Sequence, residues 1–126
     1  MCEENRIAKD VVDAALKLHK HFGAGIFENV YETTLTYELK KRGFSPRNQI
    51  PVPLVYDGIA FDVAFKMDVL VNDLVILELK SVEKLEPVHF KQLLTYLRLT
   101  GLRLGLLINF GEAVLKNGIH RIVNNL

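Results

Sequence analysis

An acid and a base share one face of a very apolar segment, residues 74–80. If this segment is a β-strand, its two-residue period puts Ile76, Glu78 and Lys80 on the same side. Lys and Glu are rarely buried without a partner. Taken alone, this spacing favours a salt bridge at a strand end. A carboxylate beside an ammonium group can also form a reaction centre, in which the acid binds a cation and the base stabilises negative charge.

A second acid, Asp68, interrupts the apolar run just upstream, so its position relative to Glu78 matters. A two-residue turn at Asn72 and Asp73 would put the two acids on opposite faces, because a one-residue slip flips every side chain. A three-residue turn that includes Leu74, or a bulge, puts them directly opposite each other, with Cβ atoms roughly 5 Å apart. We predict the odd-numbered turn, with a cation between the two carboxylates to offset their repulsion.

Two predicted helices carry further polar candidates. Glu28 and Tyr31 follow the apolar stripe of the earlier helix, so we expect Glu28 on or beside its inward face. The alternative is a boundary glutamate that reaches water. In the later helix His89, Gln92 and Tyr96 recur at i, i+3 and i+7. That row is either a solvated side or a functional face.

The elements that position these residues follow from apolar periodicity and from turn residues. Helical spacing predicts helices at residues 3–21, 26–42 and 87–100. Strand patterns predict a hairpin at 50–61 with its turn at Asp57-Gly58, and strands at 63–71, 74–80, 102–110 and near 118–123. Residues 45–51 are predicted to be a connector, and the prolines at 51 and 53 confine the first hairpin strand to a sheet edge. This order predicts an α/β or α+β domain, residues 1–126, around one mixed sheet.

Composition limits the class of protein. The chain has 126 residues with 49% hydrophobic and 25% charged side chains, as in an ordinary globular domain. A net charge of +1 excludes a strongly basic nucleic-acid coat but leaves room for a local basic groove. One cysteine, Cys2, excludes an internal disulfide and a Cys-based zinc cluster. The charged N-terminal segment and the lack of a long apolar run predict a cytoplasmic protein that does not enter a membrane.

Positive charge gathers in two places along the sequence. The clusters are Lys40, Lys41, Arg42 and Arg47, and Lys84, Lys91, Arg98 and Arg103. Ordinary solvated element ends are the alternative interpretation. The sequence shows no aromatic and basic residues interleaved in the way that single-strand stacking favours.

The segment "GAGIFENVY" has Gly25, Glu28 and Tyr31 in the pattern G-x-x-E-x-x-Y. It resembles the GxxExxY protein family, which is grouped with the PD-(D/E)XK nuclease superfamily. The similarity continues through "MDVLV", "VILELK", "PVHFKQLLTYL" and "GLRLGLLINFG", from about residue 5 to residue 124. It implies a restriction-endonuclease-like core, a central mixed β-sheet flanked by helices. Met67 departs from the pattern, because proline would precede the first acid.

Carried over residue by residue, the resemblance assigns four catalytic positions. Glu28 matches the acid of the early helix and Asp68 the first strand acid. Glu78 and Lys80 match the (D/E)-x-K pair. The resemblance implies a nuclease that binds Mg²⁺ or Mn²⁺ through the three acids, while Lys80 orients water or stabilises the phosphate.

The resemblance also gives roles to residues on the helices. Gln92 and Tyr96 form Q-x-x-x-Y, which is similar to a motif of RecB-like nucleases and makes both catalytic candidates. Tyr31, His89 and Lys91 are candidate substrate contacts. The implied partner is nucleic acid, DNA in preference to RNA, and a homodimer would double the small binding footprint. The alternatives are a non-catalytic nucleic-acid-binding or assembly module with the same fold, and a nucleotide hydrolase.

Overall fold

The protein is described by a computed structural model that covers residues 1–62 and 65–126. Its helices are α1 (Glu3–Phe22), α2 (Glu28–Lys41), α3 (Pro87–Thr100) and the short 3₁₀ helix η1 (Leu115–Gly118). Its strands are β1 (Pro46–Pro51), β2 (Leu54–Tyr56), β3 (Ile59–Phe61), β4 (Lys66–Val71), β5 (Val75–Lys80), β6 (Leu104–Asn109) and β7 (Ile119–Val123). Among the described residues, no helix has both the length and the apolar character needed to cross a membrane.

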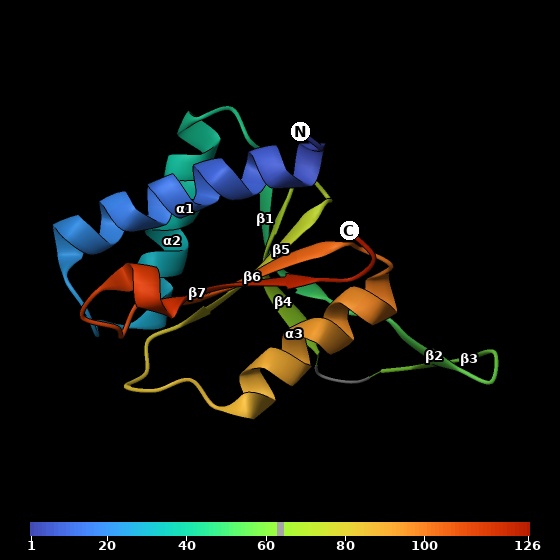
Figure 1. The fold of residues 1–126 in the computed structure, drawn as a ribbon. Helices are drawn as coiled ribbons and strands as arrows, with labels where there is room; N and C mark the ends of the chain where they lie inside the picture. The colour runs from blue at the N-terminus through green and yellow to red at the C-terminus, as the bar shows by residue number, and fades with distance from the viewer. Residues whose placement is uncertain (63–64) are drawn as a thin grey trace.

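The main sheet has five strands in the order β1-β4-β5-β6-β7, and β2 and β3 form a separate hairpin (Figure 1). Among the described strands of this sheet, only β5 and β6 pair in parallel, and the other neighbours are antiparallel. Helix α3 connects the two parallel strands, as a parallel pair requires a crossover. The predicted mixed sheet flanked by helices is therefore confirmed, as an α+β fold.

The two faces of the sheet bury different helices. Val69 and Leu77 lie in the core formed with α1 and α2, whereas Ile76 lies in the core formed with α3. Figure 1 shows α1 and α2 on one side of the sheet and α3 on the other. Because side chains alternate along a strand, Glu78 and Lys80 share the α3 side with Ile76.

The turn between β4 and β5 has three residues, as predicted. Val71 pairs with Val75, which leaves residues 72–74 in the turn. Asn72 and Asp73 both adopt the left-handed conformation, with φ of 53° and 56°. The side chain of Asn72 holds the turn in place, because its Oδ1 accepts the Ser45 N–H over 2.7 Å.

The structure corrects one predicted element and adds another. Residues 45–51 are mostly strand β1 and not a connector; Pro46 and Pro51 are tolerated at its ends because β1 is an edge strand that pairs only with β4. Residues 63 and 64, which begin one predicted strand, lie outside the described residues, and β4 starts at Lys66. The 3₁₀ helix η1 had no counterpart in the prediction. The Asp57-Gly58 hairpin turn is confirmed between β2 and β3.

Candidate active site

The two strand acids converge at the end of the β4–β5 ladder. Beyond the last regular pair, the Asp68 N–H donates to Glu78 Oε1 over 3.2 Å. In return, the Leu79 N–H donates to Asp68 Oδ2 over 2.9 Å. Glu78 is only 4% exposed, and Asp68 is half-buried. Each carboxylate therefore accepts a backbone N–H of the neighbouring strand, as a backbone carbonyl would, and this hydrogen bond fixes the position of the carboxylate.

The electrostatics of this pair favour a cation. Burial, and then the charge of Asp68, raises the pKa of Glu78 to about 9, while the Asp68 N–H and the charge of Lys80 act in the opposite direction. Without a cation, Glu78 thus keeps a proton at neutral pH. Carboxylate oxygens are the ligands that Mg²⁺ and Mn²⁺ prefer, and a divalent cation would offset the repulsion between the two acids. Asp68 and Glu78 thus supply two oxygen ligands of the kind that such a metal ion needs.

Lys80 is the last residue of β5 and lies on the same face as Glu78. Asn109, its partner on β6, fixes the segment that follows β5 through hydrogen bonds to Val82. Asn109 is fully buried. Its Oδ1 accepts the Val82 and Gly111 N–H groups, each over 3.0 Å, and its Nδ2 donates to Val82 O over 2.9 Å. A Cβ at Gly111 would lie 2.1 Å from Val82 O, so only glycine fits there. Asn109 and Gly111 position Lys80, and sequence analysis missed both.

Glu28 lies at the start of α2, and the residues just before α2 contact the segment that follows β5. It is the first residue of α2 and is exposed, so it lies beside the inward face, as a boundary glutamate does, and not on it. The buried stripe starts one turn later, at Tyr31. The Ser81 hydroxyl donates to Ile26 O, which brings the start of α2 to the end of β5. Among the described residues, no three His, Cys, Asp or Glu side chains are grouped closely enough to hold a metal ion.

Gln92 and Tyr96 lie one turn apart on α3, on the same side of the sheet as Glu78. Gln92 Nε2 donates to the Tyr96 hydroxyl over 2.8 Å, and Tyr96 is 2% exposed. Burial raises the pKa of the Tyr96 hydroxyl, and the charge of Glu78 is the next cause. The structure thus brings this tyrosine near the carboxylate pair.

Two other candidates have structural roles in the fold. Tyr31 is fully buried in the α1–α2 core, where its ring stacks on Phe110 with centroids 4.1 Å apart. Its hydroxyl donates to Gly23 O over 2.5 Å, which fixes the start of α2. His89 Nδ1 accepts the Glu86 N–H over 3.0 Å and so caps α3. The structure does not bring Tyr31 to the acids, and it gives His89 a capping role.

The positive clusters differ in what they are free to bind. Arg42, Arg47 and Arg103 are held by acidic neighbours within the chain, at Glu38, Asp73 and Glu4 respectively. Lys84 precedes α3 and Lys91 lies in its second turn, and both are exposed. Among the described residues, Lys84, Lys91, Arg98 and Lys40 form no ion pair within the chain, and two of these four, Lys84 and Lys91, lie near the start of α3.

Comparison with known proteins identifies the superfamily to which this fold belongs. The chain matches the family model of the PD-(D/E)XK nuclease superfamily over residues 5–122. The comparisons with curated proteins and with solved structures gave no match. The α+β fold, with its mixed five-stranded sheet, is consistent with a restriction-endonuclease-like core.

Proposed function

The chain belongs to the PD-(D/E)XK nuclease superfamily, and from this premise we propose that it hydrolyses phosphodiester bonds in nucleic acid at the Asp68–Glu78 pair. The observation that carries the proposal is the two converging acids beside Lys80. Nucleases of this superfamily generally use divalent metal ions. The proposal assigns Mg²⁺ or Mn²⁺ to Asp68 and Glu78, with Glu28 acting through water. It also assigns DNA as the substrate and residues 1–126 to one domain of the GxxExxY type.

Each residue of the pair contributes through its position in the sheet. When bound, the cation would polarise the phosphate and lower the pKa of a water molecule. Lys80 stabilises the negative charge that develops on the phosphate or orients the attacking water. The backbone bonds that hold Asp68 and Glu78 place both carboxylates before substrate arrives, so little reorganisation is needed during reaction.

Cleavage assays with matched lysine variants test this proposal. The protein is incubated with Mg²⁺ or Mn²⁺ and with single-stranded DNA, duplex DNA and RNA. We expect Lys80→Ala to lower the cleavage rate by about 100-fold or more, as loss of a preorganised charge-stabilising group does. Lys116→Ala removes an exposed lysine from η1 and is the control. Failure to cleave every substrate, or equal rates for the wild type and Lys80→Ala, would refute the proposal.

A non-catalytic nucleic-acid-binding module is the second candidate. The specific observation in its favour is that Glu28 is exposed and that no three-acid group is found among the described residues. A module of this kind would bind nucleic acid equally well with and without metal and would leave it intact. Nucleotide turnover with intact DNA would instead identify the nucleotide hydrolase.

A further inference from the structure

Two apolar hollows flank Lys91 at the N-terminal half of α3. One has a volume of about 350 Å³ and is lined by Phe65 and Val88 together with polar residues of α3. The other, of about 670 Å³, is lined by Leu85 and Phe90 among others. Lys91 lines both hollows. A basic side chain therefore stands between two apolar spaces, each with an aromatic ring.

The smaller hollow adjoins the candidate active site. Gln92 and Tyr96 line it, and the Phe65 and Tyr96 rings lie 5.9 Å apart. In the larger hollow, the half-buried Phe90 ring is held edge-on by His120, with centroids 5.0 Å apart. Both rings are thus fixed by an aromatic neighbour.

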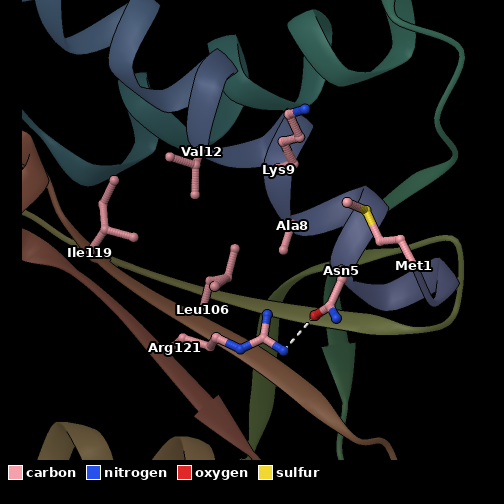
Figure 2. Close-up of a pocket in the computed structure, with 8 residues that line it drawn as sticks. All are labelled: Met1, Asn5, Ala8, Lys9, Val12, Leu106, Ile119 and Arg121. Atoms are coloured by element: carbon pink, nitrogen blue, oxygen red, sulfur yellow. Dashed lines mark hydrogen bonds between the residues drawn. The ribbon is translucent and has the colours of Figure 1, made fainter. Parts of the chain in front are cut away.

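A third hollow, of about 580 Å³, shows the contrast (Figure 2). It lies between α1 and strands β6 and β7, with Lys9 and Arg121 at its rim and Leu106 in its floor. Arg121 already donates to Asn5 Oδ1. The described residues that line this hollow include no aromatic ring. This hollow thus combines positive charge with apolar lining, but its described lining residues offer no aromatic ring on which a nucleic-acid base could stack.

Resting on the proposed function, we propose that the two hollows beside Lys91 hold two successive unpaired bases of a single-stranded segment, with the phosphate between them on Lys91. Aromatic rings combined with positive charge bind single strands without regard to sequence, because every base has a stacking face. Bases in a duplex are already stacked on each other and must be extruded before they can enter a pocket. The substrate is therefore single-stranded, or has a frayed or flapped end, where it meets α3.

Fluorescence anisotropy in EDTA measures this binding without cleavage, with labelled 12-nucleotide single strands and the corresponding duplex. We expect the single strand to bind at least about tenfold more tightly than the duplex. Phe65→Ala and Phe90→Ala should each weaken single-strand binding by about tenfold, the usual effect of removing one stacking ring. Lys91→Glu should weaken it further and reduce its salt dependence. Lys91 is exposed, so this variant tests the proposal even if an aromatic variant fails to fold.

Lys9→Ala, at the rim of the hollow in Figure 2, is the matched control and should bind as the wild type does. Equal affinity for single strand and duplex, or binding unchanged in Lys91→Glu, would overturn the inference. Single-strand preference without metal-dependent cleavage would uphold the inference and refute the proposed nuclease. If the protein cleaves nucleic acid and Phe65→Ala, Phe90→Ala and Lys91→Glu all cleave at the wild-type rate, the proposed nuclease is upheld and the inference is refuted.

Discussion

Replacing Glu78 by glutamine should make the metal-free protein more stable at neutral pH. Glu78 is buried and faces Asp68, so its pKa is raised to about 9 from the ordinary value of 4.5. The unfolded chain releases this proton above about pH 4.5, whereas the folded chain keeps it until about pH 9. Stability therefore falls as pH rises through this window. Glutamine resembles the protonated acid, because it can still accept the Asp68 N–H and has no proton to lose.

The size of the effect follows from the width of that window. At pH 7 the solution is about 2.5 pH units above the ordinary pKa, and each unit corresponds to about 1.4 kcal/mol. The pH-dependent cost of Glu78 at pH 7 is therefore on the order of 3 to 4 kcal/mol. Glu78→Gln removes that cost, so the two proteins should differ little near pH 4.5, and the difference should grow until about pH 9.

Urea unfolding in EDTA at pH 5, 6, 7 and 8 measures the difference, with Glu83→Gln at an exposed acid as the control. Mg²⁺ or Mn²⁺ should then stabilise the wild type, because it binds only the folded pair, and should stabilise Glu78→Gln much less. If the wild type and Glu78→Gln show the same dependence on pH, Glu78 is not protonated in the folded protein and the electrostatic reasoning fails.

Other variants probe the supports of the site. Asn109→Ala leaves backbone groups of Val82 and Gly111 without partners and should lower the free energy of unfolding by about 3 kcal/mol, measured by urea unfolding. Gly111→Ala places a Cβ against Val82 O and should lower both the melting temperature and the cleavage rate; unchanged values would contradict the close approach. Burial raises the Glu38 pKa but hydrogen bonds from cations such as Arg42 lower it more, so its stabilisation is lost as pH falls below about 4.5. Glu38→Gln should therefore lose less stability on acidification than the wild type.

The sequence predicted those parts of the fold that depend on local chemistry. Helix α3 begins at Pro87 and ends before Gly101, as predicted. Proline fits the first turn of a helix, and glycine fits the left-handed position that follows the last turn. The register that places Asp68 opposite Glu78 was predicted from the assumption that both acids bind one cation and therefore lie on the same face of the sheet. Strand β1 was missed because its prolines and polar residues look like a loop, and only pairing with β4 makes it a strand.

The missed parts of the site depend on contacts between distant segments. Asn109 supports Lys80 through the chain that follows β5, a contact that no spacing in the sequence reveals. An isolated asparagine at the end of an apolar strand, followed two residues later by glycine, was the available indication. Phe65 and Lys91 likewise meet only in the folded chain, so the sequence showed no interleaving of aromatic and basic residues where the structure has one.

The turn at residues 72–74 makes the centre sensitive to changes in chain length. Surface turns usually tolerate insertions and deletions, since little packs against them. Here the parity of the residue count decides whether the two carboxylates meet or point to opposite sides of the sheet. Removing one residue from this turn would leave every candidate catalytic side chain in the sequence and still separate Asp68 from Glu78.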